Sequence, residues 1–244
     1  MPAHPRSLLT PGRRRGVEIL DQPGVAPALV TRSLADVALA NTLFGGARAV
    51  LAELAAVLPL LPRTATLLDV GTGAGDIPER ARRLAARRGV ALATVGVDSV
   101  EALAAAYRRR VGHVACADAR ALPFAARSVD VVVCSQLLHH FTEAEAPVLL
   151  RELHRVARVC VIVSDLRRSW LAAAGLWLAS FPLRFHPVSR HDGVVSVLRG
   201  FTAAELTAAV DGAVGIRPRV RRRVGWRLTA SWAPGPPAAA HGRR

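Results

Sequence analysis

The stretch Leu67-Leu68-Asp69-Val70-Gly71-Thr72-Gly73-Ala74-Gly75-Asp76 decides the fold of this chain. Its apolar residues are typical of a buried parallel strand, and Asp69 stands where that strand would end. Gly71, Gly73 and Gly75 permit positive φ and remove every Cβ from a turn that a ligand has to approach closely. Since an amphipathic helical pattern follows, the stretch predicts the strand, turn and helix of a nucleotide-binding element.

Asp76 separates this turn from a dinucleotide site. A dinucleotide fingerprint has glycine at its first, third and sixth positions, so that pyrophosphate can rest on the helix N-terminus. Here the sixth position is Asp76, whose carboxylate would repel a phosphate, and Asp69 adds a second negative charge. We also expect Asp76 to cap the helix, with Glu79 completing a capping box. The turn therefore suits a ligand that has no phosphate and carries some positive charge.

Residues 69–75 resemble motif I of the class I S-adenosylmethionine-dependent methyltransferases, which reads roughly D-V-G-x-G-x-G. Downstream segments are similar to later motifs of that family and follow in its order: 95–99, 115–124, 129–135, 136–141 and 151–165. The chain resembles the broad type 11 group, which includes quinone-biosynthetic enzymes. The resemblance implies a Rossmann-like α/β fold, with a seven-stranded, mostly parallel sheet that has one antiparallel edge strand and helices on both faces.

The resemblance also implies S-adenosylmethionine as the cofactor and gives matching residues their roles. Asp69 would orient the methionine end, Asp98 would hold the ribose hydroxyls, and Asp118 would flank the adenine. An aspartate after an apolar strand is also an ordinary turn former. Three at successive strand ends, however, share the rim where open α/β folds bind ligands. The residues expected at the cofactor are Asp69, Gly71, Thr72, Gly73, Gly75, Asp98, Ser99, Asp118, Ala119 and Ser135.

The length and composition predict one α/β domain with additions. We expect disordered tails at 1–16 and 233–244, an N-terminal helical cover at 17–60, and a methyltransferase domain at 61–232 with a lid insertion at about 166–200. No apolar run reaches the length of about 18 residues that a spanning helix needs. Cys116, Cys134 and Cys160 lie on or beside predicted strands, so we interpret them as core residues in a reducing cytoplasm. No metal site is expected.

Hydrophobic periodicity outlines the elements. The helical pattern from 33 to 58 is interrupted at Gly45-Gly46, and a helix is expected from Trp170 to Ser180. Thr202 with Glu205 predicts a capping box for the last helix. Further helices are expected at 76–88, 100–109 and 143–154, strands at 66–70, 93–98, 113–116, 129–134 and 157–164, and a hairpin at 214–220 and 225–232.

The net charge of +15 raises the question of a nucleic-acid partner. All 33 basic residues are arginine, and the absence of lysine excludes P-loop and Schiff-base chemistry. The arginine clusters at 13–15, 108–110 and 221–223 lack interleaved aromatic residues that would stack on bases. We therefore favour a solvated basic surface over a nucleic-acid site, while an anionic partner, an acyl carrier or peripheral contact with a membrane stays open.

Histidines are the candidates for a catalytic base, because the unperturbed pKa of histidine lies near ~6.5. His139 and His140 follow the predicted fourth strand at the ligand-binding rim, and His191 lies in the lid. Each could equally be a hydrogen-bonded structural residue. The lid residues expected to meet the substrate are Trp170, Trp177, Arg190 and Asp192. An apolar lid favours a lipophilic or aromatic acceptor.

The sequence thus predicts a cytoplasmic enzyme of secondary metabolism that methylates a small hydrophobic acceptor on a phenolic or quinol-like hydroxyl or on a ring carbon. The segment 190–193 resembles bacterial methyltransferases that act on phenolic lipids made by type III polyketide synthases. One alternative is an RNA or other nucleic-acid methyltransferase, although 135–138 lacks the Asn/Asp-Pro-Pro-aromatic motif of amino-group methylation. A second is a non-catalytic cofactor-binding protein with a regulatory or assembly role. Oligomeric state is not predicted.

Overall fold

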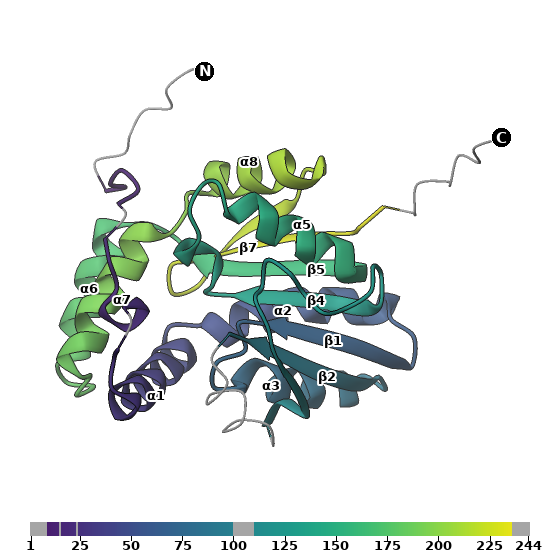
Figure 1. Cartoon of the computed structure of the whole chain (residues 1–244), viewed down its shortest axis with the longest axis horizontal. Helices are drawn as coiled ribbons and strands as arrows, with labels where there is room; N and C mark the ends of the chain where they lie inside the picture. The colour runs from purple at the N-terminus through teal and green to yellow at the C-terminus, as the bar shows by residue number, and fades with distance from the viewer. Residues whose placement is uncertain (1–8, 15, 23, 100–109, 236–244) are drawn as a thin grey trace.

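The computed structural model describes residues 9–14, 16–22, 24–99 and 110–235, built around a seven-stranded sheet in the order β3-β2-β1-β4-β5-β7-β6 (Figure 1). The strands are β1 (Thr64–Val70), β2 (Ala91–Asp98), β3 (His113–Cys116), β4 (Val129–Ser135), β5 (Ala157–Leu166), β6 (Arg219–Arg223) and β7 (Arg227–Trp232). Strands β1 to β5 pair in parallel, whereas β7 is antiparallel to both β5 and β6. The mostly parallel Rossmann-like sheet is confirmed. Its antiparallel strand lies second from the edge rather than at the edge.

Helices cover both faces of the sheet and bury its strands. On one face α2 (Gly46–Val57) and α3 (Asp76–Ala86) pack on side chains such as Leu67 and Val131. On the other face α5 (Ala146–Val156) and α8 (Ala203–Val214) pack on their neighbours Leu68 and Val132. Because both faces are covered, every residue of β4 is buried, as parallel strands require. The strand order reverses between β1 and β4, which predicts a ligand crevice at their carboxyl ends.

The helix after the glycine turn begins differently from the prediction. Gly75, in the left-handed region at φ 68°, is the N-cap of α3, and no side chain caps it. Asp76 is therefore the first helical residue, and the capping box of Asp76 with Glu79 is wrong. The capping box of Thr202 with Glu205 on α8 is confirmed. The helix expected at 100–109 lies outside the described residues.

The predicted hairpin forms later in the chain than expected. Helix α8 continues to Val214 and ends at Gly215, which is left-handed at φ 68°. The first strand of the hairpin is therefore β6, Arg219–Arg223, and not 214–220. The second strand, β7, lies within the predicted range.

A second group of elements lies beside one end of the sheet, where Figure 1 shows α1, α6 and α7 together. These are α1 (Pro27–Leu43), α6 (Trp170–Ser180), α7 (Pro187–Arg199) and the short helix η1 (Ile19–Asp21). Helix α7 is joined to α1 by hydrogen bonds from the His186 amide to Asp36 Oδ2 (2.9 Å) and from Ser189 Oγ to Ser33 Oγ (3.1 Å). We call these four elements the cover.

The N-terminal arm, residues 9–14 and 16–22, is bound to the cover. The Trp170 amide donates to the Leu9 carbonyl oxygen (3.0 Å), and the Arg14 amide donates to that of Leu198 (3.2 Å). Part of the expected N-terminal tail is therefore ordered along α6 and α7. Two 3-10 turns, η2 (Leu58–Leu60) and η3 (Leu138–His140), complete the elements of the described residues.

Two sequence expectations concern membranes and cysteines. Within the described residues, no single helix is long and apolar enough to cross a membrane, and the segments Pro27–Leu43 and Gly46–Leu60 meet that test only jointly, as a pair bent by 56°. Cys134 and Cys160 are buried as expected. Cys116 is exposed, because β3 is an edge strand and Cys116 ends it, so its assignment to the core is wrong.

Candidate functional site

A cavity of about 810 Å³ lies between the carboxyl ends of the strands and the cover. This volume falls in the range of about 300–1,000 Å³ that is usual for small-molecule sites. The sheet side contributes the glycine turn, Asp98 and Ser135, and the cover contributes mainly apolar side chains, including Leu34, Leu176 and Val197. The site predicted at the strand ends is thus a cavity that both the sheet and the cover line.

The glycine turn has the backbone that its sequence predicts. Gly71, Gly73 and Gly75 all have positive φ, at 73°, 48° and 68°. A Cβ on Gly71 would lie 2.9 Å from a methyl carbon of Leu137, so a larger residue there would have to displace that side chain as well as adopt a positive φ. The Gly73 amide donates to Asp98 Oδ2 (3.0 Å), which joins the turn to the end of β2.

Three carboxyl groups surround this turn. Asp69 is buried behind it and does not line the cavity, and its Oδ2 accepts a hydrogen bond from Thr72 Oγ1 (2.9 Å). Burial, together with the negative charges of Asp76 and Asp98, raises the pKa of Asp69 to about 8 against the opposing effect of the hydrogen bond from Thr72. Burial also raises the pKa of Asp76, which does line the cavity. A cationic ligand at this turn would relieve the repulsion among the three groups.

The other residues predicted at the cofactor mostly reach the cavity. Thr72, Ser99, Ala119 and Ser135 line it, as does Asp118, whereas Gly75 does not. The Asp118 carboxylate already accepts hydrogen bonds from the Arg120 amide (2.8 Å) and guanidinium (2.7 Å). These bonds lower the pKa of Asp118. Asp118 can therefore flank a ligand while Arg120 balances the charge of its carboxylate.

His139 lines the cavity and is fixed there by Asp165 through its backbone and its side chain. Its amide donates to Asp165 Oδ2 (3.0 Å) and its Nδ1 to Asp165 Oδ1 (2.6 Å), at the end of β5. Burial alone would raise the pKa of Asp165, but the charge and hydrogen bond of His139 outweigh it, so that pKa is lowered. With Nδ1 bound, the Nε2 of His139 has no hydrogen-bond partner among the described residues. Its closest ion-pair partner is Glu18 Oε1, at 4.0 Å.

His140 repeats this arrangement beside His139, and the two ring centroids lie 4.3 Å apart. Its Nδ1 lies 3.2 Å from Asp21 Oδ2, and its Nε2 lies 4.0 Å from Glu18 Oε2. Burial lowers the pKa of His140, but the bond to Asp21 and the charge of Glu18 outweigh burial and raise it. In turn, His140 and Arg199 overcome the effect of burial on Asp21 and lower its pKa to about 2.

Glu18 is held in place by α7. Its Oε1 accepts hydrogen bonds from Ser196 Oγ (2.8 Å) and from Arg199 (2.9 Å). Asp192 fixes the following turn, because its carboxylate accepts hydrogen bonds from the Ile19 (2.8 Å) and Leu20 (3.0 Å) amides. We refer to Glu18, His139 and His140 as the histidine cluster; all three side chains line the cavity.

Sequence reasoning missed the acidic members of this region. Glu18 and Asp21 lie in a proline- and glycine-rich arm, where no local periodicity or motif marks them. Asp165 was recognised as the end of the fifth strand, but not as the partner of a histidine. An unassigned acid at a strand end that faces two rim histidines is the one signal that could have found it.

The segment predicted as a lid, 166–200, borders the cavity through α6 and α7. Helix α7 turns Ser189, Asp192, Gly193 and Ser196 to the cavity, and α6 turns Ala172, Gly175 and Leu176, both with helical spacing. Of the predicted lid residues, Asp192 therefore lines the cavity, whereas Trp170, Trp177 and Arg190 lie off these stripes. The two tryptophans are 39% and 47% exposed, and Arg190 stacks 3.7 Å from the Phe181 ring centroid.

His191 lies off the stripe as well and does not line the cavity. Its side chain is 51% exposed, and its Nδ1 lies 2.8 Å from Asp192 Oδ1. Of the three predicted catalytic histidines, the structure brings His139 and His140 together in the cavity and leaves His191 outside it.

Comparison with known proteins also indicates a methyltransferase domain. A family model described as a methyltransferase domain matches residues 67–159. A search of curated proteins finds no match.

Three solved structures are similar over most of the chain. One is an S-adenosylmethionine (SAM)-dependent methyltransferase from Aquifex aeolicus, at 19% identity and a TM-score of 0.50, over 69% of this chain and 81% of that one. Another is a SAM-dependent methyltransferase from Thermotoga maritima, at 16% identity and a TM-score of 0.55, over 85% and 99%. The third is magnesium protoporphyrin IX methyltransferase from Synechocystis PCC 6803 with bound SAH, at 16% identity and a TM-score of 0.52, over 79% and 83%.

At these identities the structures show a shared fold, and the family model adds the motif-bearing region. Residues 67–159 therefore match a methyltransferase domain, and the chain shares its fold and strand order with solved S-adenosylmethionine-dependent methyltransferases.

Proposed function

We propose that this chain transfers the methyl group of S-adenosylmethionine to a small hydrophobic acceptor that carries a phenolic or quinol-like hydroxyl. The proposal is carried by the distribution of polar groups along the cavity. Carboxylates surround the glycine turn, and the histidine cluster and the apolar side chains of the cover line the same cavity. Such a cavity can hold a cationic cofactor and an apolar acceptor in contact.

The sheet side suits the cofactor. Gly71, Thr72 and Gly73 line the cavity and offer close backbone approach, and we propose that Asp98 holds the ribose hydroxyls and that Asp118 flanks the adenine. Asp69, buried behind the turn, would act as a positioning residue through Thr72 rather than by touching the methionine end directly. The surplus of carboxylates favours the sulfonium and ammonium charges of S-adenosylmethionine over a phosphate.

The histidine cluster suits the acceptor hydroxyl. In the reaction the hydroxyl loses its proton at this cluster, the oxygen attacks the methyl carbon, and the carbon–sulfur bond breaks with its electron pair going to sulfur. Methyl ether, S-adenosylhomocysteine and one proton are the products. The protein contributes alignment of the two reactants and exclusion of water. The apolar side chains of the cover contribute to both of these effects.

The cavity favours a small acceptor over a nucleic acid. We also propose that the protein is located in the cytoplasm. In the predicted basic cluster at 221–223, Arg223 bonds to the buried Glu53 and Arg221 lies 3.9 Å from it. These two arginines therefore stabilise the end of the sheet and do not present free charges to phosphates.

Two measurements test the proposal. Calorimetry should show that the purified chain binds S-adenosylmethionine, and absence of binding would contradict the cofactor assignment. A screen with methyl-labelled cofactor should then show transfer to phenols or quinols, with fatty acids and RNA as competing acceptor classes. Labelling of RNA alone would overturn the choice of acceptor.

A further inference from the structure

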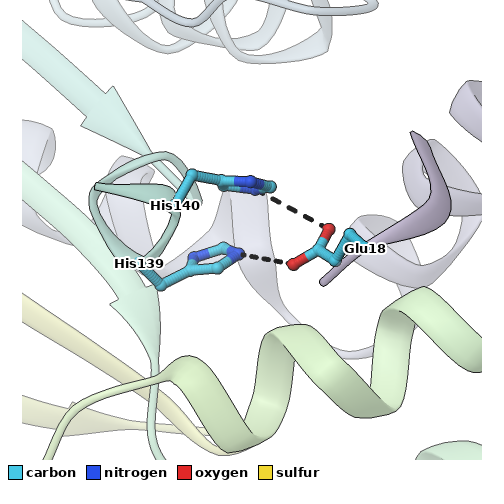
Figure 2. Close-up of side chains that lie close together, drawn as sticks. All are labelled: Glu18, His139 and His140. Atoms are coloured by element: carbon cyan, nitrogen blue, oxygen red, sulfur yellow. Dashed lines mark ion pairs between the residues drawn. The ribbon is translucent and has the colours of Figure 1, made fainter. Parts of the chain in front are cut away.

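We propose that Glu18, His139 and His140 bind a divalent transition-metal cation at the acceptor side of the cavity. Its catalytic role, to coordinate the acceptor hydroxyl, rests on the proposed function. Figure 2 shows the three side chains facing one another, with the carboxylate of Glu18 opposite both imidazoles. Two histidines and one carboxylate are a common ligand set for zinc and for non-haem iron.

The orientation of the two imidazoles is the first argument. The Nδ1 of His139 is hydrogen-bonded to Asp165, and that of His140 to Asp21. Each ring directs its Nε2 towards Glu18. Metal-binding histidines typically donate their second nitrogen to a carboxylate in this way, which fixes the tautomer and leaves a lone pair for the metal. A single histidine–carboxylate pair is common, but two adjacent pairs converging on a third acid are what a metal site requires.

The unsatisfied atom is the second argument. His139 is buried, and its Nε2 has no hydrogen-bond partner among the described residues. A buried nitrogen without a partner is destabilising, so a ligand is expected there. Both Nε2 atoms lie 4.0 Å from an oxygen of Glu18, and one atom from each residue falls within 4.8 Å of the others. Metal–ligand distances of about 2.0–2.2 Å require only a modest closing of this triangle.

Charge is the third argument. The described groups that bond or face the cluster include four carboxylates, of Glu18, Asp21, Asp165 and Asp192, and two guanidinium groups, of Arg199 and Arg227. With both imidazoles neutral, this network carries two net negative charges, which a dication would balance. Arg199 occupies Oε1 of Glu18 and leaves Oε2, which faces His140, for the cation.

Three protein ligands leave at least one coordination position for a ligand from the cavity. An acceptor hydroxyl that coordinates there has its pKa lowered by the cation, so its proton passes to solvent and the bound oxygen attacks the methyl carbon. The carbon–sulfur electron pair goes to sulfur as before. In this arrangement His139 and His140 hold the cation and do not themselves take the proton.

The experiment uses the purified full chain after treatment with a chelator. Titration with Zn²⁺, and with Co²⁺ as a spectroscopic probe, should show one strongly bound equivalent and visible Co²⁺ absorption. Glu18→Gln and His139→Gln should each weaken Zn²⁺ binding by at least about tenfold, as should the positioning variant Asp165→Asn. The matched control is His191→Gln, a histidine beside an aspartate outside the cavity, which should bind as the parent does.

The outcomes separate this inference from the proposed function. Absence of stoichiometric binding in the folded parent, or equal binding in the parent and in both ligand variants, would overturn the metal site. Asp98→Ala should lose cofactor affinity while Zn²⁺ binding persists, because its side chain bonds to the Gly73 amide and is not one of the three metal ligands. If the parent binds Zn²⁺ but no S-adenosylmethionine, the site stands and the proposed function fails. Full turnover in chelator-treated protein would contradict the catalytic role of the cation.

Discussion

The two sides of the cavity are built in opposite ways. The glycine turn and its acids come from one continuous stretch plus the end of the next strand, and the Gly73 amide bonds directly to Asp98. The histidine cluster joins the N-terminal arm, the turn after β4, the end of β5 and helix α7. A local motif can thus specify the cofactor side, whereas the acceptor side exists only once distant segments have packed together. With the proposed function, this contrast predicts that cofactor binding and acceptor binding can be altered separately in this chain.

The largest effect should come from His139→Ala, which tests whether the two sides are separable. Loss of its imidazole removes a member of the histidine cluster at which the acceptor hydroxyl loses its proton, so kcat should fall by about 10²–10⁴-fold. The affinity for S-adenosylmethionine should change by less than about twofold, because the side chain lies beyond the glycine turn. Steady-state kinetics and calorimetry on the same preparation measure both quantities. A parallel loss of cofactor affinity would show that the sides are coupled.

The converse change at the cofactor side is Asp98→Ala. It removes the hydrogen bond to the Gly73 amide and the carboxylate expected at the ribose, and charged hydrogen bonds contribute about 1.5–3 kcal/mol each. Cofactor affinity should fall by about 10–100-fold in calorimetry. Asp118→Ala is the matched control, because its carboxylate is already bonded to Arg120, and it should show a smaller loss. Equal losses in the two variants would contradict the role of Asp98 in the turn.

The third prediction concerns the proton on Asp69. Because its pKa is raised to about 8, Asp69 is largely protonated at pH 7 in the free protein. A cationic cofactor favours the carboxylate, so binding at pH 7 should release up to one proton, and release should vanish near pH 9. Calorimetry in buffers of different ionisation enthalpy measures this number. Asp69→Asn should show no pH-dependent release.

The same shift predicts how stability depends on pH. In the unfolded chain Asp69 has its ordinary pKa near ~3.9, so between about pH 4 and pH 8 the folded protein binds one more proton than the unfolded chain. The contribution of Asp69 to stability therefore decreases as pH rises through this window. The melting temperature of Asp69→Asn minus that of the parent should increase from pH 5 to pH 8. Above pH 9 this difference should stay constant. A constant difference would show that the pKa of Asp69 is not raised.

The contrast between a local motif and a cluster of distant segments also explains which features the sequence predicts. The strands around Asp69 and Asp98 and the cap at Thr202 depend on residues close in sequence, and they were predicted within a few residues. Asp76 failed as a cap because Gly75 reaches a left-handed conformation that ends the turn one residue earlier than a side-chain cap would. Glu18 was not predictable, because its role depends on the packing of a proline-rich arm against α7. The two tryptophans of α6 were predicted to meet the substrate because they are large and apolar. Helical periodicity, however, decides which residues of α6 face the cavity.

The smallest effect is expected from Asp192→Asn, which tests how the cover positions the histidine cluster. The side chain remains, but the charge that accepts hydrogen bonds from the Ile19 and Leu20 amides is lost, and this weakening is worth about 1 kcal/mol. Glu18 would then be held less tightly, so kcat/KM should fall by about fivefold while cofactor affinity is unchanged. His191→Gln removes the neighbouring ring, which lies outside the cavity, and should leave kcat/KM at the parent value. If His191→Gln lost more activity than Asp192→Asn, the base would lie on the outer face of α7. The acceptor would then enter from there, and the cover would be a binding surface rather than a support for Glu18.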